Sequence, residues 1–212
     1  DARAHLRAHG EAALAPYRNI PAIWTFWWPR FERIAEWVLS VECARRAGII
    51  ATHTEVSGAI DIEAPSGSFR LTARADRIDE LTDGGVAVID FKTGAPPTKR
   101  EVQAGFAPQL PLEAAMVALG GFEGVPAKPA EELAFWRLSG GREAGEVRNA
   151  ADDPVEVAAD AIAGLKVLVA LFDDVETAYE ARPRPEHAPA YSDYEHLARV
   201  REWASGGGVV EE

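Results

Sequence analysis

The stretch VAVIDFKTGAPPTK, residues 86–99, runs from an apolar segment into a proline-rich turn. The unbroken apolar run at 86–89 predicts a strand that is covered on both faces of a sheet. Because alternate residues of a strand share a face, Asp90 and Lys92 project together and Phe91 projects to the other side. A carboxylate and an ammonium group at the rim of a sheet can bind a metal ion and an anion, and they can equally form a salt bridge. The neighbouring sequence has to distinguish these two possibilities.

Two more strands are predicted directly before this one. The segments 53–63 (HTEVSGAIDIE) and 68–80 (SFRLTARADRIDE) flank the turn APSG, and the turn TDGG leads into the third strand, at 86–92, so the three predict an antiparallel meander. Asp76 precedes Asp90 by 14 residues, so a hairpin of this size can bring their carboxylates together on neighbouring strands. Two carboxylates that share a site repel each other unless a cation lies between them. An all-oxygen site suits Mg²⁺, Mn²⁺ or Ca²⁺, and Lys92 beside it could orient or deprotonate a water or stabilise charge on a phosphate.

The rest of the chain predicts helices around this sheet. Helical patterns occupy 1–15, 31–47, 99–119, 154–181 and 192–204, and a further strand occupies 132–138. Because proline is tolerated only in the first turn of a helix, the firm part of the segment from Lys99 begins near Pro108. We therefore predict an α/β fold with a mixed four-stranded sheet, in which helix 108–119 crosses to strand 132–138 and helices cover both faces. Pro154 opens its helix, with Asp152 or Asp153 as the N-cap. Three regions follow from this order: an N-terminal helical region at 1–50, the core with its covering helix at 51–181, and a linker, short helix and tail at 182–212.

The composition excludes several classes of protein. The 212 residues are 47% hydrophobic, which is enough for a substantial core, and the single cysteine excludes a disulfide framework and a four-cysteine metal site. The net charge of −12 argues against a general nucleic-acid coat protein. No apolar run approaches the roughly 20 residues of a membrane span, and no series of basic, apolar and cleavage-site residues resembles a signal peptide. We expect a cytoplasmic protein, and we interpret a chain that begins at Asp1 as a fragment of a longer one.

Three motifs, ARADRID, VIDFKTG and PQLPLEAA, follow one another along the chain. Together they resemble the nuclease domain of RecB-type exonucleases in the PD-(D/E)XK superfamily, whose pattern is G-x-x-D-R-I-D, then D-[YF]-K-T-G, then Q-L-x-x-Y. The resemblance covers about residues 50–140. The tryptophan-rich segment before it and the sequence DYEHLARVREW after it resemble the C-terminal region of alphaproteobacterial AddB. This resemblance implies a restriction-endonuclease-like core and a metal-dependent DNA exonuclease in a helicase–nuclease complex with an AddA-like partner subunit, acting in double-strand break repair.

The resemblance also implies roles for individual residues. Asp76 and Asp90 match the metal ligands, for Mg²⁺ or Mn²⁺, and Lys92 matches the catalytic lysine. Gln109 matches the glutamine that supports the active site and contacts the DNA backbone or the attacking water. Glu55, on the first strand, is a less well matched candidate for the acidic residue that some relatives carry there.

The chain departs from the family pattern at three places. Ala73 stands where the pattern has glycine, and Glu113 stands where it has tyrosine, which puts in doubt the contribution of that helix to DNA contact. The family also has a metal-binding histidine on an upstream helix, for which this chain offers only His5, His9 and His53. We expect the true histidine to lie before the first residue, so that this fragment would have an incomplete metal shell and weak or absent activity.

Other interpretations remain open for these residues. A non-catalytic domain of the same fold could bind DNA ends or a partner subunit, and a metal-free binding domain could hold the aspartate–lysine pair as a structural ion pair. We interpret Arg77 and Asp79, on the opposite face of their strand, as a structural pair, and Cys43 as a small buried apolar residue. The aromatic cluster at 24–28 could stack on bases, but few basic residues interleave it, and we favour a packing role.

Overall fold

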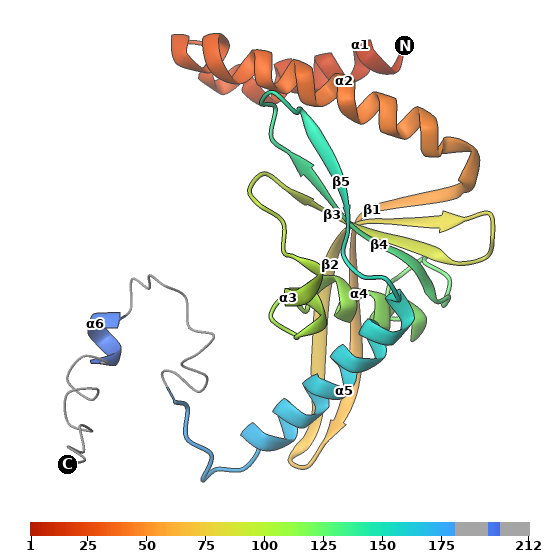
Figure 1. The fold of residues 1–212 in the computed structure, drawn as a ribbon, viewed down its shortest axis with the longest axis vertical. Helices are drawn as coiled ribbons and strands as arrows, with labels where there is room; N and C mark the ends of the chain where they lie inside the picture. The colour runs from red at the N-terminus through yellow and green to blue at the C-terminus, as the bar shows by residue number, and fades with distance from the viewer. Residues whose placement is uncertain (181–194, 200–212) are drawn as a thin grey trace, which may run out of the picture. The chain divides into compact units, whose positions relative to one another are not determined.

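A five-stranded sheet, in the order β1-β2-β3-β4-β5, lies at the centre of the unit that residues 1–173 form (Figure 1). The structure, a computed structural model, describes residues 1–180 and 195–199. The strands are β1 (Ile49–Ala64), β2 (Gly67–Leu81), β3 (Val86–Lys92), β4 (Ala130–Leu138) and β5 (Gly145–Asn149). β1, β2 and β3 pair antiparallel as a meander, β3 and β4 pair parallel, and β5 pairs antiparallel with β4. The predicted α/β fold with a mixed sheet is confirmed. The sheet has five strands where four were predicted, and the additional strand is the short edge strand β5.

Helices lie before, between and after the strands. They are α1 (Ala2–Leu14), α2 (Trp28–Arg45), α3 (Lys99–Gln103), α4 (Gln109–Ala118), α5 (Pro154–Phe172) and α6 (Glu195–Ala198), with short turns η1 (Ala15–Tyr17), η2 (Ile23–Trp27) and η3 (Arg46–Gly48). The residues Asp1–Asp173 form one compact unit, which holds the sheet and α1 to α5, and Asp174–Glu212 form a second. Most of the predicted C-terminal helix and linker lies outside the described residues. No helix in the described parts of the chain combines the length and apolar character of a membrane span.

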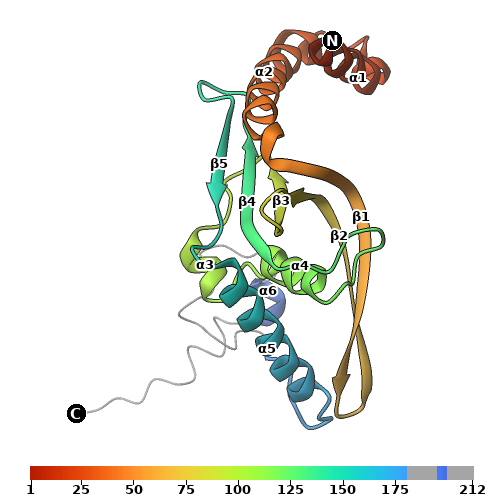
Figure 2. The same cartoon turned by 90° about the vertical axis from the view of Figure 1, so that its right-hand side faces the viewer.

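The apolar run of β3 is buried on both of its faces. Val86, Ala87, Val88 and Ile89 are each 0% exposed. Val86 and Val88 belong to the main core together with α4, whereas Ile89 packs with Trp136 of β4 and Trp37 of α2. We call these two sides the α4 face and the α2 face of the sheet. Figure 2 shows α4 and α5 packed along each other beside the sheet.

Local sequence signals set the ends of the helices. Pro108 caps α4, so the helical segment from Lys99 is divided into α3 and α4. Asp153 caps α5 by accepting a hydrogen bond from the backbone N–H of Glu156, at 2.9 Å. α5 ends at Phe172, earlier than the predicted residue 181.

Ion pairs and aromatic rings join α2 to the sheet. Arg77 donates hydrogen bonds to Asp79 and to Glu42 of α2, which agrees with a structural role for the Arg77–Asp79 pair. The Trp37 and Trp136 rings meet edge to face at 5.8 Å between centroids.

Two predictions for the N-terminal region need revision. Cys43 is exposed and not buried, because it lies on the side of α2 away from the sheet-contacting Trp37 and Glu42. Within the aromatic cluster, Trp24 and Trp28 pack together, whereas Phe26 and Trp27 are 67% and 58% exposed. Packing therefore accounts for only part of that cluster.

Candidate active site

The four predicted site residues come together where β2, β3 and α4 meet on the α4 face. β2 supplies Asp76, the end of β3 supplies Asp90 and Lys92, and the first turn of α4 supplies Gln109. The β2–β3 ladder pairs residues 77–80 with 86–89, so Asp76 lies just beyond it. There its Oδ2 accepts a hydrogen bond from the backbone N–H of Phe91, at 2.9 Å. The carboxylate of Asp76 is thus held beside the strand end that carries the aspartate–lysine pair.

Lys92 connects the strand end to the helix. Its Nζ lies 3.0 Å from Oδ1 and 2.8 Å from Oδ2 of Asp90, and it donates to Oε1 of Gln109 at 3.3 Å. The Asp90 side chain is only 4% exposed, whereas that of Lys92 is 33% exposed. The ammonium group is therefore bound on one side by protein oxygens and remains accessible to solvent on the other.

Glu113 is a fifth member of the site, and the sequence had indicated it only as a departure from the family pattern. It lies one helical turn after Gln109, so both side chains are on the same side of α4. Nε2 of Gln109 donates to Oε1 of Glu113 at 3.2 Å, and Glu113 is 3% exposed. Its Oε2 is buried and has no hydrogen-bond partner.

Burial and mutual repulsion alter the acidity of these carboxyl groups. Burial is the main cause that raises the pKa of Glu113 from 4.5 to about 7, and the charges of Asp90 and Asp76 add to it against the hydrogen bond from Gln109. Burial also raises the pKa of Asp90, and the hydrogen bond and charge of Lys92 oppose this effect. The site therefore combines three carboxyl groups with one ammonium group, an excess of acid that favours a cation.

The residues present fit a divalent cation. Oδ2 of Asp90 is buried and accepts no hydrogen bond, although the Lys92 ammonium lies nearby. This oxygen therefore has lone pairs that can coordinate a metal ion. Within residues 1–180 and 195–199, no group of three or more His, Cys, Asp or Glu side chains converges as a metal site. Mg²⁺ commonly uses one or two carboxylates and completes its shell with water and substrate phosphates, so Asp76 and Asp90 are the side chains that would hold it.

The three histidine candidates lie elsewhere. His53 of β1 is paired with Glu80 of β2, with Nε2 to Oε1 at 2.9 Å. His5 and His9 are exposed on α1. In the described part of the chain, no hydrogen bond or ion pair joins any of them to Asp76 or Asp90.

Glu55 and Ala73 are the other residues singled out from the family pattern, and their contacts indicate structural roles. Glu55 has a backbone φ of 53°, which is uncommon for a residue with a side chain, and it is exposed. Its carboxylate pairs with Arg74 at 3.0 Å, which supports its interpretation as a solvated strand residue. Ala73 packs against the main core from β2.

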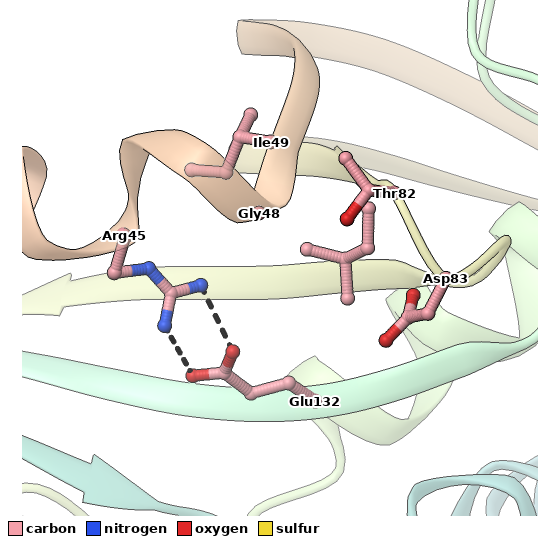
Figure 3. Close-up of a pocket in the computed structure, with 7 residues that line it drawn as sticks. Arg45, Gly48, Ile49, Thr82, Asp83 and Glu132 are labelled. Carbon is pink, nitrogen blue, oxygen red and sulfur yellow. Dashed lines mark hydrogen bonds and ion pairs between the residues drawn. The ribbon is translucent and has the colours of Figure 1, made fainter.

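A separate pocket of about 210 Å³ lies at the turn between β2 and β3 (Figure 3). It is lined by Arg45, Gly48, Ile49, Leu81, Thr82, Asp83 and Glu132. Arg45 donates two hydrogen bonds to the two carboxylate oxygens of Glu132, both at 2.9 Å. This pocket lies at the start of β3, whereas Asp90 and Lys92 lie at its end, and its main charged pair is already satisfied. We therefore place the candidate active site at the end of β3.

Comparisons with known proteins place the chain in a protein family. A sequence model of the PD-(D/E)XK nuclease superfamily matches residues 3–197. An uncharacterized protein of Rickettsia bellii and protein RT0391 of Rickettsia typhi are each 26% identical to the chain over 96 residues, which is 45% of this chain. The chain spans only 12% and 11% of the length of these two relatives. A solved structure, the crystal structure of SSO0001, aligns with a TM-score of 0.33 and 19% identity over 76% of this chain and 69% of that one.

Proposed function

The chain belongs to the PD-(D/E)XK nuclease superfamily, and on this premise we propose that it hydrolyses DNA phosphodiester bonds with the help of a divalent metal ion. Members of this superfamily are generally hydrolytic nucleases, and they typically use divalent metals. The observation that carries the proposal is the convergence of Asp76, Asp90 and Lys92 at the end of β3, with Lys92 Nζ 3.0 Å and 2.8 Å from the Asp90 oxygens.

Each side chain of the site has a definite part in this reaction. Asp76 and Asp90 would hold Mg²⁺ or Mn²⁺, which when bound supplies a Lewis acid and lowers the pKa of a water molecule. Lys92 carries a fixed positive charge that can bind a phosphate oxygen or direct the attacking water. Gln109 accepts a hydrogen bond from Lys92, so the ammonium group has a second acceptor besides Asp90.

We propose, more narrowly, that the domain acts within a cytoplasmic helicase–nuclease complex of the RecB or AddB type. Its exonuclease activity would then be coupled to unwinding by an AddA-like partner subunit during double-strand break repair. The order of the three motifs and the sequences on either side of them support this assignment. The net charge of −12 fits a domain that relies on other parts of a complex for most of its contacts with DNA phosphates.

The proposal is tested by a nuclease assay on the protein in its full natural length. Linear double-stranded and single-stranded DNA are incubated with Mg²⁺, with Mn²⁺ and with chelator, using wild type, Asp90→Ala and Lys92→Ala. Asp61→Ala, in the β1–β2 hairpin, and Lys166→Ala, on α5, serve as controls, because they remove the same kinds of charge from exposed positions away from the site.

We expect metal-dependent cleavage by wild type and by both controls, and no cleavage by either site variant, with melting temperatures that show an intact fold. Cleavage that survives both site substitutions would rule out this active site. If Mn²⁺ raises the melting temperature of wild type but not of Asp90→Ala, and no protein cleaves DNA, the domain is a metal-binding scaffold and not an enzyme.

A further inference from the structure

A continuous chain of hydrogen bonds links the end of β3 to the interior of α4. Lys92 Nζ donates to Oε1 of Gln109 at 3.3 Å, and Gln109 Nε2 donates to Oε1 of Glu113 at 3.2 Å. Gln109 is otherwise exposed, so these two contacts are what hold its amide group. The side chain of Glu113, in contrast, is buried, as are most of its neighbours in α4.

The chemistry of the two ends fixes the direction of the amide in the middle. An ammonium group can only donate hydrogen bonds, and Oε1 of Glu113 accepts one from Gln109, as a carboxylate oxygen or as the carbonyl oxygen of an acid protonated on Oε2. Gln109 therefore has to turn its oxygen toward Lys92 and its NH₂ group toward Glu113. The family pattern has tyrosine at position 113. A tyrosine hydroxyl can either donate or accept a hydrogen bond, so it would constrain the direction of the Gln109 amide less than Glu113 does.

The direction of the Gln109 amide decides what surrounds the Lys92 ammonium. Of the described residues, only Asp90 and Gln109 bind this ammonium group. If the amide rotated, its NH₂ group would face the ammonium, and Asp90 would remain as the sole acceptor. Lys92 would then compete more strongly for the carboxylate that the proposed function assigns to a metal ion.

We infer that Glu113 is a positioning residue, which orients Lys92 through the side-chain amide of Gln109. This inference rests on the proposed nuclease function, since it gives that reaction a further residue. The Glu113 side chain makes no ion pair with any described residue, and the only hydrogen bond it forms with them is the one that it accepts from Gln109. A buried acid with this single contact is otherwise a cost to the fold, and the orientation of Gln109 gives it a role.

The test compares substitutions that remove or retain the acceptor at position 113. Glu113→Leu removes it, Glu113→Gln retains a carbonyl oxygen, and Gln109→Leu breaks the chain at its exposed link. We expect Glu113→Leu to lower kcat by about 10- to 100-fold, the range for residues that orient a catalytic group, with little change in KM. Glu113→Gln should keep more activity than Glu113→Leu, and Glu113→Leu should cause little further loss when added to Gln109→Leu.

A second readout does not depend on activity. The labelling rate of Lys92 with acetic anhydride is measured by mass spectrometry in metal-free protein, with Lys166 as the internal standard. Acetic anhydride reacts at Nζ, and an Nζ held between Asp90 and Gln109 is less accessible to the reagent than one held by Asp90 alone, so Lys92 should be labelled faster in Glu113→Leu and Gln109→Leu than in wild type or Glu113→Gln.

The outcomes separate this inference from the proposed function. An inactive wild type counts against the nuclease proposal, and the labelling rates then still decide the role of Glu113. Equal labelling of Lys92 in all four proteins, or equal kcat for the Leu and Gln variants of Glu113 in an active enzyme, overturns the inference. If Glu113→Leu does not fold, Gln109→Leu and Glu113→Gln decide by the same labelling comparison.

Discussion

Substituting Glu113 by glutamine should change how the stability of the metal-free protein depends on pH. The side chain is buried and hydrogen-bonded to Gln109, and burial is the main reason why its pKa rises from 4.5 to about 7. A group that holds its proton more tightly in the folded state stabilises that state most when it is protonated. Glutamine has nearly the same shape and carries no charge at any pH, so Glu113→Gln removes this dependence and little else.

The magnitude follows from the displacement of the pKa. Each factor of ten in proton affinity is about 1.4 kcal/mol, so a pKa raised from 4.5 to about 7 corresponds to about 3 kcal/mol when the carboxyl group is fully ionised. The folded state is favoured below the unfolded pKa, and this stabilisation is lost as the pH rises through the folded pKa. Between pH 5 and pH 8 wild type should therefore lose about 2 kcal/mol relative to Glu113→Gln.

Urea unfolding at four pH values between 5 and 8, with a chelator present, measures this difference directly. The free energy of unfolding of Glu113→Gln minus that of wild type should grow steadily with pH. Glu101→Gln is the control, because hydrogen bonds from Thr98 lower the pKa of Glu101, and its replacement should give no such growth. Equal slopes for wild type and Glu113→Gln across this range would refute the reasoning, because Glu113 would then ionise as easily in the folded protein as in the unfolded chain.

Two further predictions concern the α2 face. Arg77→Leu should lower the free energy of unfolding by about 3 kcal/mol in urea titrations, because it removes the guanidinium 2.8 Å from the fully buried carboxylate of Asp79 and leaves that carboxylate with Arg45, at 3.8 Å, and the Thr52 hydroxyl. A loss below about 1 kcal/mol would mean that Arg45 and Thr52 are enough to hold Asp79. Gly145→Ala should cost about 1–3 kcal/mol in thermal or urea unfolding, since a Cβ there overlaps the ring of Trp37, whereas Gly48→Ala meets no atom nearby and should be close to neutral.

The strands that build the site could be predicted from sequence because their signals are local. The apolar run 86–89 and the turn before it determine β3, whose observed bounds equal the predicted ones. The hairpin then carries Asp76 to the end of the same ladder, and an interval of two residues puts Asp90 and Lys92 on one face. Gln109 follows from the position of Pro108, which fixes where α4 begins.

The features that the sequence did not indicate depend on contacts between distant segments. β5 has only Val147 as a large apolar residue and is defined by its pairing with β4, so no periodic pattern could reveal it. Similarly, Val175, Ala178 and Tyr179 continue a helical spacing beyond Phe172, but this periodicity does not show where packing against α4 stops. The role of Glu113 was missed because its identity suggested a lost contact, whereas its burial could be seen only after α4 was placed on the sheet.

Strand β2 carries charged residues to both faces of the sheet, and the two faces differ in how their acidic side chains are paired. On the α2 face, the acids Glu42, Asp79 and Glu132 are each bound to a guanidinium of Arg77 or Arg45. On the α4 face, Asp90 has Lys92, but neither Asp76 nor Glu113 forms an ion pair with any residue in the described part of the chain. Buried charges that neutralise one another are sufficient to attach a helix and need no ligand. An unneutralised pair of acids beside a solvent-accessible lysine is costly for the protein alone, and a bound cation with a phosphate is the combination that balances both kinds of charge.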